Sequence, residues 1–417
     1  MIVAVIGLGY IGLPTAALIA SKGIKVVGVD VNHHVVSIIN QGKIHIVEPD
    51  LDILVQSSVQ SGNLRATTET EKADVFIVAV PTPFQENHEP NLSYIKSAAK
   101  AIAPVLRKGN LVILESTSPV GTTEKLTQWM SEGRSDLSFP EFGISSIFDV
   151  AVAYCPERVL PGDIVRELVE NDRIIGGLTT QCAEKARDFY NTFIKAECLI
   201  TDSRTAELSK LVENSFRDVN IAFANELSLI CDKLNLNVWE LIKFANHHPR
   251  VNILQPGPGV GGHCLAVDPW FVIDSAPEEA KLIHTARLVN ESKPDFVIEK
   301  INQAVDILNK KRSEIKICCL GLSFKPNIDD LRESPALFIA QKVSMMGFKK
   351  QYLVEPNIDK MPEILNTKKA NLVDLETAIN NSDIVVLLVD HSLFKELDLV
   401  LLSGKQLIDT RGSWNFL

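Results

Sequence analysis

The stretch IVAVIGLGYIGLPTAALIASKGIKVVGVD, residues 2–30, decides the fold of the N-terminal part of this 417-residue chain. It opens on a continuous apolar run, as expected of a buried parallel strand. A G-x-G-x-x-G pattern follows at Gly7–Gly12, then a helical segment and a second strand, Lys25–Val29, that ends in Asp30. Strand, glycine-rich turn, helix, strand and acidic residue in this order predict a Rossmann unit, in which a dinucleotide pyrophosphate rests on the helix N-terminus.

Asp30 indicates which dinucleotide is bound. It lies 18 residues after Gly12, at the position where a carboxylate accepts hydrogen bonds from the adenosine ribose hydroxyls. The same carboxylate would repel a 2′-phosphate, so the sequence predicts NAD rather than NADP. An empty Rossmann-like scaffold is the alternative reading of this stretch.

Composition narrows the class of protein. The net charge of −10 argues against nucleic acid as a partner, so local cations and backbone amides must hold any anionic ligand. Seven cysteines, an odd number without C-x-x-C spacing, favour a reducing cytoplasm over a disulfide framework or a zinc ribbon. Residues 1–20 are apolar, but glycines and Pro14 interrupt them, and we predict neither a signal peptide nor a membrane span.

Further strands are expected to end at the same edge of the sheet, where ligands of such folds bind. The apolar runs are Val75–Val80, Leu111–Leu114 and Ala151–Tyr154. Thr82 and Thr117 follow the first two and are placed to contact a cofactor, although each alone also fits a turn or cap. Glu157 and Arg158 follow the third. Glu157 is a candidate base and Arg158 a candidate ligand for phosphate or carboxylate; a solvated Glu–Arg pair is the alternative.

Residues 204–234 contain no proline or glycine and predict one long helix. Lys210, Asn214 and Arg217 fall on one face of it. A desolvated lysine can exchange protons near neutral pH, so Lys210 is a candidate acid–base group beside a positioning asparagine; the wet side of a helix is the alternative. Apolar residues on this helix favour a homodimer. A second helix is expected at Val238–Asn246 and a further one at Lys281–Glu291, with a break at Ser292–Pro294.

The glycine-rich stretch Gly259–Asp268 is the candidate centre of the chemistry. Cys264 follows three glycines and precedes Asp268, so a thiol lies beside flexible backbone donors that suit an oxyanion. A structural cysteine in a tight turn is the alternative. The adjacent His247 and His248 point in different directions and lack matching cysteine or acid spacing, so no metal is predicted.

The C-terminal part resembles a second half of a Rossmann unit. An apolar strand at Ile315–Leu320 enters a turn that carries one glycine, Gly321, instead of three. This part should therefore not bind a second dinucleotide in the same manner. Lys325, Arg332 and Arg411 lie on loops at strand ends, and three such cations suit a nucleotide diphosphate. Scattered surface charge is the alternative.

Four motifs together identify a resemblance to the UDP-glucose/GDP-mannose dehydrogenase family over essentially the whole chain. They are Gly7–Gly12 with Asp30, Lys210–Phe216, Gly261–Asp268 and Gly321–Pro335. The stretches Glu48–Leu51, Tyr154–Pro161 and His248–Asn252 most resemble the UDP-N-acetyl-D-mannosamine dehydrogenase branch. The resemblance implies an α/β protein with an NAD-binding Rossmann domain at residues 1–200, a central long-helix domain at 201–298 and a Rossmann-like UDP-sugar-binding domain at 299–417.

The resemblance also implies roles for individual residues. Cys264 is similar to a nucleophile that forms a thiohemiacetal and then a thioester, and Lys210 to an acid–base and oxyanion-stabilising lysine. Asn214 and Asp268 would position water and a proton relay, and Glu157 would act as the base of thioester hydrolysis. Cofactor contacts are implied for Gly7, Gly9, Tyr10, Ile11, Gly12, Asp30, Thr82, Thr117 and Arg332. Substrate contacts are implied for Arg158, Val159, Lys210, Asn214, Arg217, His248, Arg250, Gly261, Lys325 and Arg411.

The activity implied is a four-electron oxidation of a sugar C6 alcohol to a carboxylate, with UDP-N-acetyl-D-mannosamine as the leading substrate. UDP-N-acetylglucosamine, UDP-glucose and GDP-mannose are alternatives, and His263 beside the cysteine departs from the UDP-glucose branch. In the wider family the position of Arg250 reaches across a dimer interface. A two-electron hydroxy-acid dehydrogenase would not need Cys264. A non-catalytic nucleotide-sugar sensor would tolerate loss of the lysine or the cysteine, and both are present.

Overall fold

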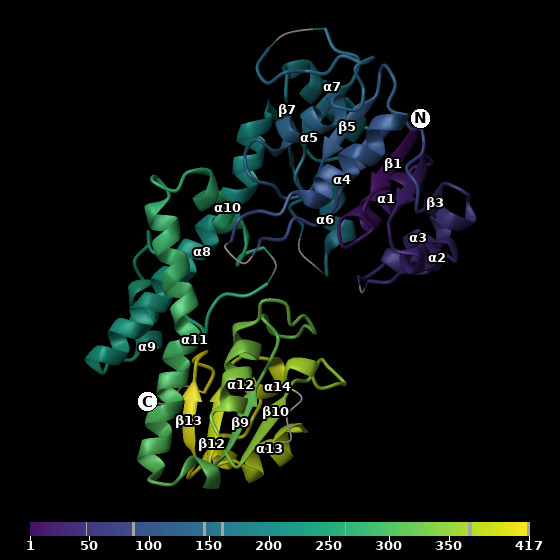
Figure 1. Ribbon diagram of the computed structural model, residues 1–417. Coiled ribbons are helices and arrows are strands. Elements are labelled where there is room, and N and C mark those ends of the chain that lie inside the picture. The colour runs from purple at the N-terminus through teal and green to yellow at the C-terminus, as the bar shows by residue number, and fades with distance from the viewer. Residues whose placement is uncertain are drawn as a thin grey trace. The chain divides into compact units, whose positions relative to one another are not determined.

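The chain folds into two compact units, Met1–Glu213 and Asn214–Leu417, in the computed structural model (Figure 1). The structure describes residues 1–46, 48–85, 88–144, 147–159, 162–262, 264–365 and 369–414. His263 lies outside the described residues, as do Leu160 and Pro161 of the loop after the third predicted strand. The α/β class predicted from the sequence is confirmed.

The first unit is built on an eight-stranded sheet in the order β3-β2-β1-β4-β5-β6-β7-β8. Its strands are β1 (Ile2–Ile6), β2 (Lys25–Val29), β3 (Leu64–Thr67), β4 (Val75–Val78), β5 (Leu111–Leu114), β6 (Ala151–Tyr154), β7 (Arg173–Gly177) and β8 (Cys198–Asp202). All neighbours are parallel except β6 and β7. The central strands read as apolar runs because both faces of the sheet are buried.

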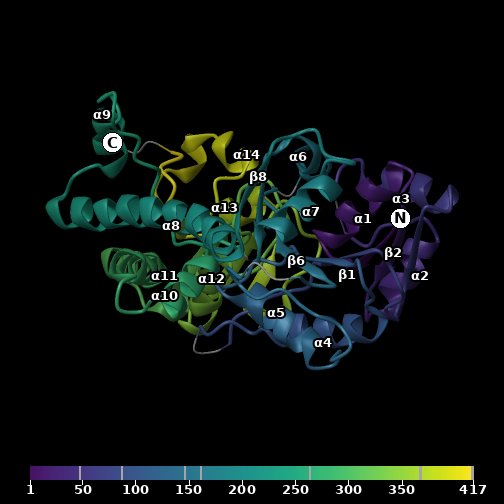
Figure 2. The ribbon, with the colours of Figure 1, turned by 90° about the horizontal axis from the view of Figure 1, so that it is seen from above.

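Helices cover both faces of this sheet. They are α1 (Gly12–Ser21), α2 (His33–Asn40), α3 (Leu51–Gln60), α4 (Ser93–Ile102), α5 (Thr122–Ser131), α6 (Ile164–Glu170) and α7 (Thr180–Tyr190). Along β1, Val3 and Val5 pack with α1, α3, α6 and α7, whereas Ala4 and Ile6 pack with α4 and α5. Figure 2 shows α4 and α5 on one side of the sheet and α1 and α7 on the other. Because successive side chains of a strand point to opposite faces of the sheet, they contribute to two separate hydrophobic cores.

The second unit carries a five-stranded parallel sheet in the order β11-β10-β9-β12-β13. Its strands are β9 (Lys316–Leu320), β10 (Lys350–Val354), β11 (Ala370–Leu372), β12 (Ile384–Leu387) and β13 (Gln406–Asp409). The helices of the C-terminal half are α8 (Ser203–Leu234), α9 (Val238–Ala245), α10 (Asp268–Ser275), α11 (Lys281–Leu308), α12 (Pro335–Met345), α13 (Leu375–Asn381) and α14 (Ser392–Lys395). Helices α11 and α12 pack on one face of the sheet, and α13 and α14 on the other. No helix in the described ranges is both long and apolar enough to cross a membrane.

Helix α11 corrects one prediction. The break expected after Glu291 is wrong, because the helix continues through Pro294 to Leu308. An internal proline removes one helical hydrogen bond and costs about 3 kcal/mol. Pro294 and Val297 are both buried, so tertiary packing of the helix outweighs that cost.

A buried polar network joins α8 to α11 inside the second unit. Asp218 and Arg287 form an ion pair at 2.7 Å, with side chains only 0% and 3% exposed. The side-chain amide of Asn290 donates to the same Asp218 oxygen at 2.8 Å and to the Asp218 carbonyl at 3.1 Å. Burial raises the pKa of Asp218, and the nearby Arg287 guanidinium opposes that shift. The pair therefore fixes the register of the two helices as well as their contact.

Replacing Arg287 by methionine should destabilise the protein by about 3–5 kcal/mol, because the buried Asp218 would lose its counter-charge. The matched control is Lys310→Met, since Lys310 and Asp383 pair at 3.4 Å with side chains 50% and 30% exposed. That change should cost about 0–1 kcal/mol. Free energies of unfolding from denaturant titration measure both. A loss in the Arg287 variant no larger than in the control would contradict the assignment.

Candidate active site

The turn after β1 has the shape of a pyrophosphate cradle. A Cβ on Gly7, whose φ is +92°, would lie 2.5 Å from the carbonyl oxygen of Ala79. A Cβ on Gly12 would lie 1.8 Å from the Gly7 carbonyl oxygen, so both positions require glycine. A Cβ on Gly9 would meet nothing within 4 Å. Open space thus lies beside the middle glycine at the start of α1, where a dinucleotide phosphate binds.

Asp30 is held in place by the same turn. Its carboxylate accepts the Leu8 backbone N–H at 3.0 Å and the Asn32 N–H at 2.9 Å. The N–H of Gly7 donates to the Val29 carbonyl at 2.8 Å. The acid is therefore fixed at the end of β2 next to the cradle, and these residues fit NAD.

The threonines after β4 and β5 are brought together. The Thr82 hydroxyl donates to the Thr117 carbonyl at 2.6 Å. Between the same two segments, the Ser116 hydroxyl accepts the Val80 N–H at 3.0 Å and donates to the Val80 carbonyl at 2.8 Å. The two strand ends are thus locked to each other, and Thr82 is buried. Near the cradle, the Tyr10 side chain is 43% exposed.

Glu157 and Arg158 lie in opposite environments. Glu157 is buried and forms an ion pair with Arg173 of β7, and both side chains are 5% exposed. Arg158 instead binds Glu213 of α8 at 2.6 Å and donates to the Asp172 carbonyl at 3.2 Å. The solvated Glu157–Arg158 side-chain pair considered from the sequence is therefore wrong: the partner of Glu157 is Arg173. Val159 is half-buried and packs against the first core.

A buried cluster surrounds this ion pair. The Tyr190 hydroxyl donates to Glu115 at 2.7 Å, and the Arg173 guanidinium lies 4.8 Å from the centre of the Tyr190 ring. Burial and the neighbouring Glu157 carboxylate raise the pKa of Glu115 to about 7. Burial raises the pKa of the Cys155 thiol to about 12, which keeps that cysteine protonated. Cys155 is thus a buried, protonated cysteine, whereas Cys264 is exposed.

Helix α8 presents Lys210 from a fixed position. Glu207, one turn earlier and fully buried, accepts the Gly121 N–H at 2.6 Å and the Thr123 N–H at 2.8 Å. It therefore caps α5 and fixes the first turns of α8 within the first unit. Lys210 is half-buried, and Arg217 is exposed on the same helix. Glu207 was not predicted from the sequence, although it stands next to Ala206 among the core positions of the helix.

The second unit brings Asn214 and Asp268 together. The Asn214 side-chain amide donates to Asp268 at 2.6 Å, and Asp268 is 3% exposed. Asp268 opens α10, and its N–H donates to the Cys264 carbonyl at 2.9 Å. Cys264 itself is exposed. An asparagine and a carboxylate are thus ordered around the backbone that carries an accessible thiol.

The buried network of α8 and α11 also holds the Cys264 loop at two points. The Gly257 N–H donates to Asn225 at 2.9 Å, and the Asn225 amide donates to Asn290 at 2.8 Å. Arg287 donates to the Leu265 carbonyl at 3.4 Å. The loop is therefore fixed on both sides of the cysteine by side chains that lie in the interior.

The glycines of this loop are required by packing. A Cβ on Gly261 would lie 2.5 Å from the Glu333 carbonyl oxygen and 2.8 Å from the Phe324 side chain. A Cβ on Gly262, whose φ is +83°, would lie 2.9 Å from the Phe324 ring. The sequence predicted backbone donors for a ligand at these glycines. In the structure, Gly261 and Gly262 leave the room that Phe324, in the segment after β9, occupies.

The cations of the C-terminal loops have different surroundings. Lys325 is exposed, whereas Arg332 pairs with Asp330 at 2.7 Å. Arg411 binds Asp390 at 2.8 Å, and its guanidinium reaches within 2.5 Å of the position of a Cβ on Gly257. His248 and Arg250 are both exposed, and the Arg250 N–H donates to the His248 ring at 3.3 Å. Among the described residues, no group of three His, Cys, Asp or Glu side chains is arranged to hold a metal.

Comparison with known proteins shows which family the chain resembles along its length. Residues 1–194 match the NAD binding domain of the UDP-glucose/GDP-mannose dehydrogenase family, residues 204–292 its central domain and residues 318–415 its UDP binding domain. A UDP-N-acetyl-D-mannosamine dehydrogenase of Campylobacter jejuni is 62% identical over 94% of this chain and 96% of its own. An NDP-N-acetyl-D-galactosaminuronic acid dehydrogenase of Ralstonia nicotianae is 59% identical over 99% of this chain and 96% of its own. The solved UDP-D-ManNAc dehydrogenase of Pyrococcus horikoshii aligns with a TM-score of 0.87 and 39% identity, over 99% of this chain and 96% of that one.

The raised pKa of Glu115 predicts that stability falls as the pH rises. Because the folded-state pKa of about 7 exceeds the ordinary value of 4.5, the folded state binds more protons between these values. The stabilisation is complete below about pH 4.5 and is lost as the pH rises through 7, with a slope of at most about 1.4 kcal/mol per pH unit. Glu115→Gln should remove this slope. The free energy of unfolding of the variant should therefore rise relative to that of the wild type between pH 5 and 8.

Free energies of unfolding at several pH values measure the effect, with exposed Glu141→Gln as the control that keeps the wild-type profile. Parallel profiles for Glu115→Gln and wild type would show that Glu115 does not carry the proton.

Proposed function

Because the chain belongs to the UDP-glucose/GDP-mannose dehydrogenase family and is an NAD-dependent nucleotide-sugar dehydrogenase, we propose that it oxidises the C6 alcohol of UDP-N-acetyl-D-mannosamine. The product is UDP-N-acetyl-D-mannosaminuronate, a precursor for surface polysaccharide. The ordered Asn214–Asp268 pair next to the exposed Cys264 is the observation that carries the four-electron chemistry. The name of the Campylobacter jejuni relative supports the sugar.

Lys210 serves the first oxidation. NAD⁺, when bound, takes up the hydrogen and electron pair that leave C6 in each oxidation. Lys210 accepts the proton of the C6 hydroxyl and stabilises the negative charge that develops on that oxygen. Its half-buried position on α8, anchored through Glu207, suits a group that must be fixed before the reaction.

Cys264 serves the second oxidation. Its thiolate adds to the aldehyde carbon, a C–S bond forms, and the oxygen takes up a proton to give a thiohemiacetal. Loss of the remaining C6 hydrogen, with that proton, leaves a thioester. Water then adds to the thioester carbonyl, the C–S bond breaks, and the carboxylate and the thiol are released. The covalent bond also prevents escape of a reactive aldehyde.

Three polar residues support these steps. Asn214 and Asp268 orient the attacking water and relay protons, which their mutual hydrogen bond of 2.6 Å supports. Glu157 is proposed as the base of hydrolysis. Its present ion pair with Arg173 means that it must act from a buried position. Uptake of a proton by Glu157 would neutralise its carboxylate and so weaken its ion pair with Arg173.

Ligand contacts follow the same assignment. NAD is held by Gly7, Gly9, Tyr10, Ile11, Gly12, Asp30, Thr82, Thr117 and Arg332. The UDP-sugar is held by Arg158, Val159, Lys210, Asn214, Arg217, His248, Arg250, Gly261, Lys325 and Arg411. The seven free cysteines suit the cytoplasm as the proposed compartment.

A homodimer through α8 is part of the proposal. Large apolar side chains on this helix are exposed, and they are Leu208, Val212, Phe216, Phe223, Ile230 and Leu234. An apolar surface of this kind is typical of a subunit interface. Phe216, 70% exposed, is its most open aromatic residue.

A second candidate substrate has a specific observation behind it. The Ralstonia nicotianae relative, 59% identical, is named for NDP-N-acetyl-D-galactosaminuronic acid. Both sugars carry a 2-acetamido group and differ in the configuration of ring hydroxyl and acetamido substituents. Oxidation of the galactosamine series is therefore the main alternative, ahead of UDP-N-acetylglucosamine, UDP-glucose and GDP-mannose.

A panel of these five nucleotide sugars tests the function directly. We expect the highest kcat/KM for UDP-N-acetyl-D-mannosamine, with two NADH formed per sugar. A preference for UDP-N-acetylgalactosamine would transfer the assignment to the second candidate. Binding of a nucleotide sugar without NADH from any of the five would favour a sensor.

Replacing Cys264 by alanine should stop the reaction at or before one NADH per active site and abolish the uronic acid. The cofactor turn and Lys210 remain, so the first oxidation stays possible, but the aldehyde has no thiol to join. Single-turnover absorbance of NADH with mass analysis of the sugar measures both. Cys198→Ala, a half-exposed cysteine elsewhere, is the control and should keep two NADH per sugar. Carboxylate formed by Cys264→Ala at the wild-type rate would refute the covalent mechanism.

A further inference from the structure

The turn after β9 repeats the backbone contacts of the turn after β1. Gly321 has a φ of +91°, and its N–H donates to the Val354 carbonyl at 2.8 Å. The Leu322 N–H donates to the Glu355 carboxylate at 2.7 Å. Glu355 thus occupies the place in the second unit that Asp30 has in the first, as the acid that follows the neighbouring strand.

The second turn uses its acid differently. Ser323 stands where the first turn has Gly9, and its N–H also donates to Glu355, at 3.0 Å. Glu355 is buried, and Asn357 contacts its other oxygen at 3.2 and 3.3 Å. The carboxylate is therefore committed to the protein interior, and the open space of the first cradle is filled by a side chain.

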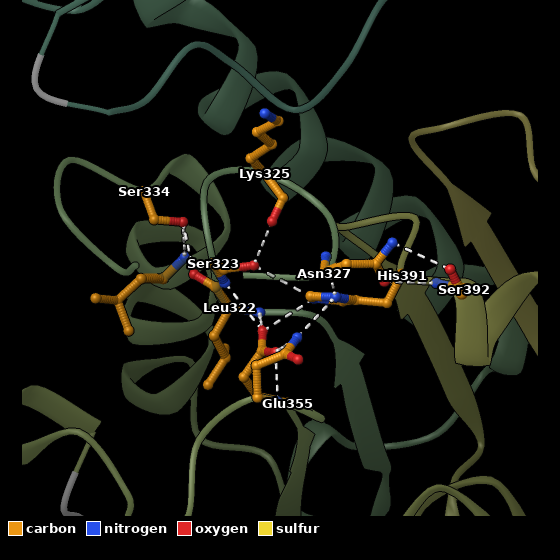
Figure 3. A network of polar contacts seen from close by, with 10 residues as sticks. Leu322, Ser323, Lys325, Asn327, Ser334, Glu355, His391 and Ser392 are labelled. Carbon is orange, nitrogen blue, oxygen red and sulfur yellow. Dashed lines mark hydrogen bonds and ion pairs between the residues drawn. The ribbon is translucent and has the colours of Figure 1, made fainter. Parts of the chain in front are cut away.

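His391 completes this interior network (Figure 3). The ring is fully buried, and its Nδ1 accepts the Asn327 backbone N–H at 2.9 Å. Because Nδ1 accepts, the neutral ring carries its proton on Nε2. Nε2 lies 3.1 Å from the Glu355 carboxylate, to which it donates, and 3.3 Å from the Ser323 hydroxyl.

These contacts fix the backbone on both sides of Lys325. The Ser323 hydroxyl donates to the Lys325 carbonyl at 2.8 Å, and His391 holds the N–H two residues later. Asn327 has a φ of +62° and is clasped by Ser392 through two hydrogen bonds of 3.0 Å. The Lys325 side chain leaves the network and points away from it (Figure 3). The exposed ammonium of Lys325 therefore extends from a backbone segment whose conformation is fixed by the buried side chains of Ser323 and His391.

We propose that His391 is a positioning residue for nucleotide binding: it holds the loop so that Lys325 meets the diphosphate of the substrate. The inference rests on the proposed function, in which Lys325 contacts the UDP group. His391 touches no ligand itself and acts through the Asn327 N–H. The Nδ1 atom holds the loop directly through the Asn327 N–H, whereas Nε2 contacts Glu355 and the Ser323 hydroxyl.

Two isosteric variants separate the two ring nitrogens. In His391→Asn the side-chain oxygen can take the place of Nδ1 and accept the Asn327 N–H. In His391→Gln the amide nitrogen takes the place of Nε2 and keeps the contacts with Glu355 and Ser323, but the acceptor for the Asn327 N–H is lost. UDP binding by calorimetry should weaken about tenfold in His391→Gln, the worth of one lost hydrogen bond. It should stay within about threefold of the wild type in His391→Asn, and NAD binding should be unchanged in both.

Two further variants keep the outcomes distinct. Ser323→Ala removes the other contact that flanks Lys325 and should weaken UDP binding in the same direction, with NAD binding unchanged. Lys325→Met tests the proposed function itself. If Lys325→Met weakens UDP binding but His391→Gln does not, or if both His391 variants lose equally, the positioning role is refuted. If Lys325→Met binds UDP as the wild type does, the assignment of Lys325 fails, and this inference fails with it.

Discussion

The buried ion pair between Asp218 and Arg287 is the interaction on which the geometry of the second unit depends. It joins two long helices at a point where both side chains are almost completely removed from water. An apolar contact of the same size would hold the helices with less directional preference. The same network holds the loop that carries Cys264, since Arg287 binds the Leu265 carbonyl and Asn225 binds the Gly257 N–H. The thiol of Cys264 is exposed, but the backbone that carries it is tied to the interior on both sides.

The two Rossmann-type turns show how a small change in sequence alters the use of one backbone shape. In the first turn, Gly9 leaves space, and Asp30 is anchored at the strand end beside it. In the second, Ser323 fills that space, and Glu355 binds backbone and His391 in the interior. The first turn has room for a dinucleotide phosphate, whereas the second is filled by side chains that hold the backbone around Lys325. This difference gives a physical reason for the expectation that the C-terminal domain holds no second dinucleotide in the manner of the first.

The sequence was most informative where chemistry depends on local spacing. Residues 2–30 specify strand, turn, helix and acid within one stretch, and the structure confirms each of these elements. The buried contacts of Arg173, Glu207 and His391 were not predicted, because an isolated polar or charged residue is usually exposed and their partners are distant in the chain. Glu207 contacts a residue 84 positions away, and His391 contacts Glu355 36 positions away. The helix through Pro294 was missed for the related reason that burial of its sides is a property of the tertiary fold.

We propose that one cysteine, Cys264, carries the sugar covalently between the two oxidations. Rapid quenching during turnover, followed by peptide mass analysis, measures this directly. The peptide that contains Cys264 should gain the mass of the acylated nucleotide sugar within the first turnover and lose it as the uronic acid forms. Without NAD⁺ no such adduct should appear. Formation of two NADH per sugar while the Cys264 peptide stays unmodified at every quench time would contradict a covalent role for Cys264.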